Sequence, residues 1–157
     1  MEKIGIFVDV QNVYYTTKEA FGCGFDYNAF WKEATLDKKV VCAFAYAINR
    51  GDEKQLRFQN MLRAIGFEVR LKQYIQRKDG SSKGDWDVGI TIDMLEWADK
   101  VDSMILVSGD GDFAILVDAL RKKHNVEVTV YGAEKLTAQA LIVSANAFRP
   151  IKGNLLH

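Results

Sequence analysis

The sequence predicts an α/β fold in which helices cover both faces of a mainly parallel β-sheet. Segments with strand patterns alternate with segments with helix patterns along the whole chain, which is typical of parallel strands joined by crossover helices. The strand segments are short and almost continuously apolar, as expected for strands buried on both faces. The chain has 157 residues, 48% of them hydrophobic, which is enough for one domain with a substantial core.

The first strand is expected over residues 3–10, where an apolar run gives way to polar side chains from Asp9 onwards. A helix over about residues 13–20 follows, and glycines end it. Asp26 then has the position of an N-cap for a second, short helix with aromatic residues on its apolar side.

The second strand is expected over residues 39–47 and the third over residues 68–76. The helix between them starts after Asp52, which forms the spacing of a capping box with Gln55. Apolar residues at i, i+3, i+4 and i+7 give this helix one buried face, and Gly66 ends it.

A polar, net basic loop follows the third strand and leads into a helix from about residue 85 to residue 98. This helix is apolar on two sides, so it is either deeply buried or part of a subunit contact. We therefore expect that the chain can form a homodimer. The two stripes consist of Val88, Ile92 and Leu95, and of Ile90, Met94 and Trp97.

The fourth strand is expected over residues 103–108 and the fifth over residues 127–131, with a helix over about 113–123 between them. A last helix covers roughly residues 137–145. Residues 1–150 then form a single domain, and residues 151–157 form a short C-terminal tail.

The 21 basic and 21 acidic residues cancel, so no global field draws the protein towards nucleic acid or an anionic membrane. Binding of a polyanion would depend on a local basic patch. The N-terminal residues have the pattern of a strand and not of a signal peptide, and no apolar run is long enough to span a membrane. We expect a cytoplasmic protein with no membrane partner.

Acidic side chains follow two of the expected strands. Asp9 and Asn12 follow the first strand, and Asp110 and Asp112 follow the fourth. In a doubly wound sheet these turns lie at one edge, and they face each other if the two strands are neighbours. Carboxylates gathered at one point repel each other unless a cation lies between them, and a hard divalent cation suits oxygen ligands. Such an edge is suited to metal-assisted cleavage of phosphate esters.

Each of these residues also has a simpler interpretation. Asp9 can cap the next helix, but an aspartate in an apolar strand is costly to bury for that purpose alone. Asn12 is equally suited to a cap, and Asp112 has the position of an N-cap, which does not exclude a metal role. Ser108 either donates to a phosphate oxygen or satisfies the end of its strand.

The start of the helix after the third strand adds further candidates. Asp85 has the position of its cap, and Asp87 lies in the first turn, where a carboxylate also favours the helix dipole. Asp93 lies about 9 Å further along the helix and about 120° round from Asp87, so it is a second-tier candidate. Three basic residues of the preceding loop are either solvated or in contact with phosphate: Arg77, Lys78 and Lys83.

Three sequence elements together resemble the NYN domain family of PIN-like proteins, and within it the bacterial LabA-like branch. They are Phe7-Val8-Asp9-Val10-Gln11-Asn12, Lys83-Gly84-Asp85-Trp86-Asp87-Val88 with Asp93, and Ser108-Gly109-Asp110-Gly111-Asp112-Phe113. The resemblance implies a PIN-like (Rossmann-like) α/β/α sandwich with a five-stranded, mainly parallel sheet of order 3-2-1-4-5. It also implies a site for one or two Mg²⁺ or Mn²⁺ ions. The implied metal ligands and catalytic residues are Asp9, Asp87, Asp110 and Asp112, with Asp85 competing with Asp87 for one role and Asn12 as the polar partner.

The leading hypothesis is a metal-dependent endoribonuclease in which metal-activated water attacks a phosphodiester of RNA in line. Asn12 and Ser108 would contact the substrate, together with the basic loop residues Arg77, Lys78 and Lys83. A phosphatase of the haloacid dehalogenase type is less favoured, because the position of its acid/base aspartate is occupied by Gln11. The alternative is a non-catalytic PIN-like module that binds RNA or protein.

Overall fold

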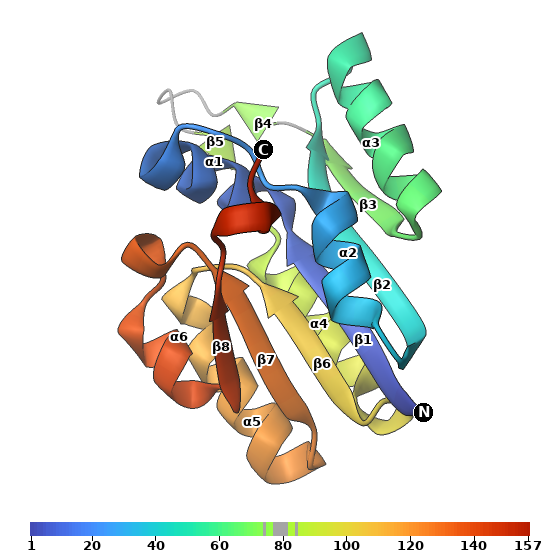
Figure 1. The fold of residues 1–157 in the computed structure, drawn as a ribbon, viewed down its shortest axis with the longest axis vertical. Helices are drawn as coiled ribbons and strands as arrows, with labels where there is room; N and C mark the ends of the chain where they lie inside the picture. The colour runs from blue at the N-terminus through green and yellow to red at the C-terminus, as the bar shows by residue number, and fades with distance from the viewer. Residues whose placement is uncertain (74, 77–81, 84) are drawn as a thin grey trace.

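The computed structural model describes residues 1–73, 75–76, 82–83 and 85–157 of the chain. Six parallel strands form one sheet in the order β3-β2-β1-β6-β7-β8, so the chain winds outwards from β1 in both directions (Figure 1). Helices cover both faces of this sheet. The expected α/β/α sandwich is therefore confirmed, and so is the order 3-2-1-4-5 for the first five strands of this sheet.

The elements agree closely with the expected strands and helices. In the first half of the chain they are β1 (Glu2–Asp9), α1 (Val10–Phe21), α2 (Tyr27–Thr35), β2 (Lys38–Asn49), α3 (Glu53–Ile65), β3 (Glu68–Gln73), β4 (Ile75–Gln76) and β5 (Ser82–Lys83). In the second half the strands and α-helices are α4 (Asp87–Trp97), β6 (Ser103–Val107), α5 (Ala114–His124), β7 (Glu127–Gly132), α6 (Gln139–Ser144) and β8 (Ala147–Pro150). Short 3₁₀ turns are η1 (Ala98–Lys100), η2 (Gly111–Phe113), η3 (Glu134–Leu136) and η4 (Gly153–Leu155). No helix within the described ranges has both the length and the apolar character needed to cross a membrane.

Two helices begin at the caps that the sequence predicts. The side chain of Asp26 accepts a hydrogen bond from the N–H of Ala29 at 2.9 Å, and that of Asp52 accepts one from the N–H of Gln55 at 2.7 Å. Gly66 ends α3 with a φ of 140°, a conformation that side chains rarely adopt. These local signals explain why the helix boundaries around α2 and α3 follow the sequence.

Two hydrophobic cores lie on the two faces of the sheet. One lies beneath α1, α2 and α3 and contains Phe30 and Ile6. The other lies beneath α4, α5 and α6 and contains Met94 and Phe7. The neighbours Ile6 and Phe7 on β1 thus point to opposite faces, and both are fully buried. The central strands are therefore held from both sides, which fixes the position of their carboxyl ends.

The sheet has one strand more than expected, because residues 147–150 form β8 at its edge beside β7. This segment has only four residues, and it ends with Arg149-Pro150, so it lacks a strand pattern. An edge strand tolerates a proline because one of its sides makes no ladder hydrogen bonds. At the other edge, the expected third strand ends at Gln73, and β4 and β5 form a separate antiparallel pair.

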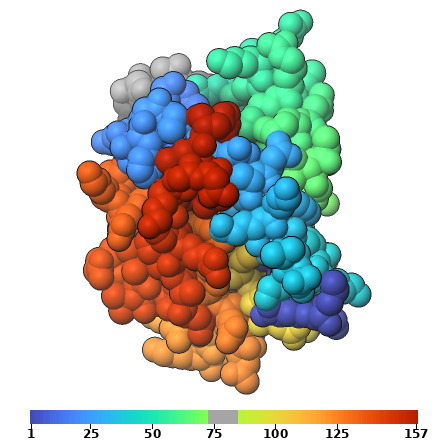
Figure 2. All heavy atoms as spheres, viewed as in Figure 1, coloured from blue at the N-terminus to red at the C-terminus, as the bar shows by residue number. Residues whose placement is uncertain are grey.

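The last residues, 151–157, are part of the packed structure. Ile151 and Leu155 are buried in the same core as α1 and α2, and Leu156 forms an antiparallel bridge with Phe25. Figure 2 shows this C-terminal segment in red, crossing the surface between blue and orange parts of the chain. The expected tail therefore covers the core.

Helix α4 buries one of its two apolar stripes. Ile90 and Met94 are fully buried, whereas Val88, Ile92 and Leu95 are 70%, 57% and 40% exposed. A homodimer formed through the exposed stripe stays a prediction.

Candidate metal centre

The carboxyl ends of β1 and β6 lie side by side at one edge of the sheet. The two strands pair in parallel, with Val8 opposite Val107. The residues that follow them, Asp9 on one side and Ser108 to Asp112 on the other, are therefore neighbours. The expected juxtaposition of these two turns is confirmed.

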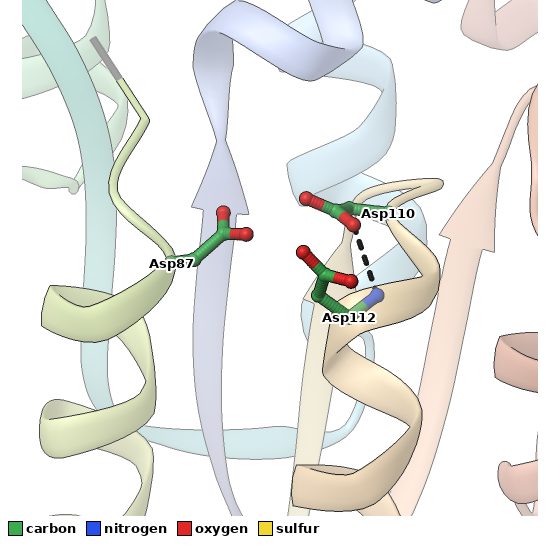
Figure 3. Close-up of side chains that lie close together, drawn as sticks. All are labelled: Asp87, Asp110 and Asp112. Carbon is green, nitrogen blue, oxygen red and sulfur yellow. Dashed lines mark hydrogen bonds between the residues drawn. The ribbon is translucent and has the colours of Figure 1, made fainter. Parts of the chain in front are cut away.

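Three aspartates converge at this edge. One carboxylate oxygen from each of Asp87, Asp110 and Asp112 lies within 4.8 Å of the other two. Figure 3 shows Asp87 at the start of α4 facing Asp110 and Asp112, which come from the turn before α5. Asp87 and Asp110 are half-buried and Asp112 is exposed, so the group is open to solvent on one side. Three oxygen ligands at one open point form a donor set that suits Mg²⁺ or Mn²⁺.

The turn after β6 is held by its own backbone. The carboxylate of Asp110 accepts a hydrogen bond from the N–H of Asp112 at 2.9 Å (Figure 3), so Asp110 is the N-cap of η2. The expectation that Asp112 is the N-cap of its helix is wrong, because Asp112 lies inside η2 and Phe113 is the N-cap of α5. A Cβ on Gly109 would lie 2.6 Å from the carbonyl oxygen of Leu136, so only glycine fits where this turn packs on the η3 segment.

Asp9 lies behind the three aspartates instead of among them. Its side chain is only 6% exposed, and the residue stands at the N-cap position of α1. The hydroxyl of Ser108 donates to Asp9 Oδ2 at 3.0 Å and accepts a hydrogen bond from the N–H of Asp110 at 3.2 Å. Asp9 therefore acts on the cluster through Ser108 and the backbone of Asp110.

Asn12 forms a second link between the two turns. Its side-chain oxygen accepts a hydrogen bond from the N–H of Gly109 at 2.9 Å. Asn12 lies inside α1, so the capping role that was an alternative for it does not apply. Its amide nitrogen makes no hydrogen bond within the part of the chain that the structure describes, which leaves a donor beside the cluster.

Two of the carboxyl groups have raised pKa values. Burial raises the pKa of Asp9 to about 6, and the nearby Asp110 and Asp85 add to the rise, against hydrogen bonds from Ser108 and the backbone of Asn12. Burial also raises the pKa of Asp87 to about 7, followed by a hydrogen bond and charge repulsion from Asp110 and by the charges of Asp85 and Asp9. Mutual repulsion of this kind is relieved by a bound cation.

The start of α4 distinguishes Asp87 from Asp85. Asp85 is exposed, and its side chain accepts a hydrogen bond from the N–H of Asp87 at 3.2 Å. It therefore supports the first turn, although the N-cap position itself is occupied by Trp86. Asp87 is the residue whose carboxylate joins the cluster.

Trp86 and Lys72 form the wall beside this turn, and sequence reasoning missed both. The indole N–H of Trp86 donates to the carbonyl of Ala47 at 2.9 Å. Lys72 Nζ lies 4.7 Å from the centre of the indole ring and donates to the carbonyl of Asp85 at 2.9 Å. Lys72 lies near the end of β3. A lysine in a partly apolar strand was the only sequence feature that could have indicated its place at the site.

Asp93 does not join the carboxylate cluster. The hydroxyl of Tyr46 donates to its carboxylate at 2.8 Å, and Arg70 forms an ion pair with it at 3.2 Å. Asp93 therefore links α4 to strands β2 and β3 of the sheet, through Tyr46 and Arg70.

The basic loop residues lie largely beyond what the structure describes. Arg77 and Lys78 lie outside the described residues. Only the backbone of Lys83 is described, as part of β5. Their contact with substrate stays a prediction.

Comparisons with known proteins bear on the family and on the fold. The family model of the NYN domain matches residues 3–152. The low amplitude and bright protein LabA of Synechococcus elongatus is 28% identical over 149 residues, which cover 88% of this chain and 78% of that protein. The crystal structure of a protein of unknown function from Vibrio parahaemolyticus is 58% identical, with a TM-score of 0.95 over 99% of this chain and 96% of that one. MurG of Acinetobacter baumannii, 10% identical with a TM-score of 0.50 over 99% of this chain and 42% of its own, shares the fold alone.

Proposed function

The chain belongs to the NYN domain family, and we propose that it is a metal-dependent endoribonuclease. The observation that carries the proposal is the convergence of Asp87, Asp110 and Asp112, whose carboxylate oxygens lie within 4.8 Å of one another. A bound cation would offset the mutual repulsion of these carboxylates, which lie at the ligand-binding edge of this fold.

Asp87, Asp110 and Asp112 would hold one or two Mg²⁺ or Mn²⁺ ions. When bound, such an ion supplies a Lewis acid that lowers the pKa of water and stabilises charge on phosphate oxygens. Asp9 would keep the Ser108–Asp110 turn in place, because it holds the Ser108 hydroxyl that accepts from the Asp110 backbone. We thus assign Ser108 a positioning role, since it is 1% exposed and already makes two hydrogen bonds.

Substrate contacts would come from the rim of the cluster. The amide nitrogen of Asn12, which makes no hydrogen bond within the described residues, would donate to a phosphate oxygen beside the turn that carries Asp110. Arg77, Lys78 and Lys83 would steer the RNA strand across the site. Water would then attack the phosphodiester in line, and the products would carry a 5′-phosphate and a 3′-hydroxyl.

The distribution of charge supports a polyanionic substrate. Residues 50–83 contain nine basic and four acidic residues, a net charge of +5, so the remainder of the chain carries −5. The neutrality of the whole chain hides this separation. The basic segment includes Lys72, whose ammonium group touches the backbone of Asp85 at the edge of the cluster. A local positive field beside a metal site favours binding of a phosphate backbone.

The test is incubation of the full chain with labelled RNA, with and without Mn²⁺, and analysis of the product ends. We expect metal-dependent cleavage that Asp110→Asn abolishes and that Asp99→Asn, an exposed aspartate of η1, leaves unchanged. Cleavage that survives Asp110→Asn would assign the activity to a contaminant. Metal-independent binding without cleavage would instead support a non-catalytic RNA-binding module.

A further inference from the structure

Two neighbouring tyrosines are exposed to solvent on α1, the helix that begins at the candidate site. Tyr14 and Tyr15 are 53% and 52% exposed, and their ring centres lie 5.2 Å apart at an interplanar angle of 78°. Neither hydroxyl makes a hydrogen bond within the described ranges, and neither ring belongs to the two cores. The fold thus gives no reason for two large aromatic rings at this surface.

Their helix begins at the edge of the sheet that carries the carboxylates. α1 begins directly after Asp9, and Asn12 of its first turn is hydrogen-bonded to Gly109. Tyr15 follows Asn12 by three residues, a rise of about 4.5 Å along the helix.

A lysine accompanies the aromatic pair. Lys18 is exposed and lies one turn beyond Tyr14, and its Nζ lies 5.7 Å from the centre of the Tyr14 ring. Aromatic faces next to a cation are the combination with which proteins bind single-stranded nucleic acid: bases stack on the rings and the cation meets the phosphates.

We propose that Tyr14 and Tyr15, with Lys18, are a platform on which unpaired bases of the RNA stack. The proposal rests on the proposed function, because it adds a contact surface for the RNA that the same site receives. In a duplex the base faces are stacked on one another and cannot reach a protein ring. A paired substrate would therefore gain nothing from these tyrosines.

Binding is measured in EDTA, so that no cleavage occurs, by fluorescence anisotropy of a labelled 12-nucleotide RNA and of the same sequence as a blunt duplex. We expect Tyr14→Ala/Tyr15→Ala to weaken binding of the single strand roughly tenfold or more, since each stacked base contributes substantially. Tyr14→Phe/Tyr15→Phe keeps both rings and should bind as tightly as the parent. The matched control is Phe21→Ala, which removes a ring that is 42% exposed at the far end of the same helix.

The preference for the single strand decides the proposal. Loss of the preference in the alanine variant, with duplex binding and melting temperature unchanged, supports the platform. Unchanged binding of the single strand, or an equal loss for both RNAs, overturns it. Because the measurement needs no metal, absence of cleavage with tyrosine-dependent binding would reject the nuclease and keep the platform. Cleavage with tyrosine-independent binding would do the reverse.

Discussion

Ser108 Oγ lies 3.0 Å from Asp9 Oδ2, a hydrogen bond between residues that are 99 positions apart in the sequence. It joins the ends of two adjacent parallel strands directly behind the aspartate cluster. Because the same hydroxyl also accepts from the backbone of Asp110, one side chain fixes both a buried carboxylate and a candidate metal ligand.

Ser108→Ala should therefore destabilise the protein by about 1–3 kcal/mol, because it leaves a buried carboxyl and a backbone N–H without their partner. Urea denaturation of the metal-free protein measures this loss. In the Asp9→Asn background the same substitution should cost less, because a hydrogen bond to a charged group is stronger than one to a neutral amide. Equal losses in both backgrounds would contradict a coupling between the two residues.

The pH dependence of stability follows from the raised pKa values of Asp9 and Asp87, about 6 and about 7 against an ordinary value of 3.8. Between these limits the folded protein holds more protons than the unfolded chain. The stability that these two groups contribute is thus fully present below about pH 3.8 and is lost as pH rises through 6 and 7.

In EDTA, the melting temperature of the parent should consequently fall between pH 5 and pH 8. The melting temperature of the Asp9→Asn/Asp87→Asn variant should fall less over the same range. Asp99→Asn, which removes one exposed carboxylate away from the site, serves as the control. If the melting temperature changed with pH to the same extent in the parent and in the double variant, the raised pKa values would be contradicted.

Metal binding should reverse this trend, because a divalent cation binds the deprotonated carboxylates. At about 100 times its Kd, Mn²⁺ should stabilise the folded chain by about 2.7 kcal/mol. The shift in melting temperature should grow from pH 6 to pH 8 and be lost in Asp87→Asn or Asp112→Asn. An equal shift in the parent and in these variants would place the cation elsewhere.

Sequence reasoning could predict the edge of the sheet but not the contacts within it. Strand patterns with polar ends fixed which turns meet, because parallel strands have all their carboxyl ends at one edge. They could not show that Asp9 points to Ser108, or that Asp87 and not Asp85 enters the cluster. The first contact depends on the pairing of β1 with β6. The second depends on how the start of α4 is placed, where the indole N–H of Trp86 donates to the carbonyl of Ala47.

The same limit explains the elements that were missed. Strand β8 is held by its pairing with β7, since its own four residues carry no alternating pattern and end in a proline. Likewise, the role of Lys72 depends on the packing of α4 beside β3, which brings its ammonium group to the ring of Trp86. Long-range packing decides these features, and a local sequence pattern does not encode them.

Asp93→Asn should affect stability without affecting metal binding. The substitution weakens the hydrogen bond from Tyr46 and removes the ion pair with Arg70, which is partly exposed, so we expect a loss of about 1–2 kcal/mol. Calorimetric titration with Mn²⁺ should give the parent's Kd. A Kd raised tenfold or more in a variant that is still folded would return Asp93 to the set of metal ligands.

Gly109→Ala should impair the site more than its small size suggests. Its Cβ would lie 2.6 Å from the Leu136 carbonyl oxygen and 3.2 Å from Thr137 Cα, and both are backbone atoms that cannot rotate away. The turn would have to move, which would break the hydrogen bond from the Gly109 N–H to Asn12 and shift Asp110.

We expect Mn²⁺ affinity to fall at least tenfold, together with a loss of about 1–3 kcal/mol in stability. Gly24→Ala, whose added Cβ would meet only the His157 side chain at 3.8 Å, is the control for glycine substitution and should leave Mn²⁺ affinity unchanged. Unaltered metal binding in Gly109→Ala would show that the position of the turn does not determine the site.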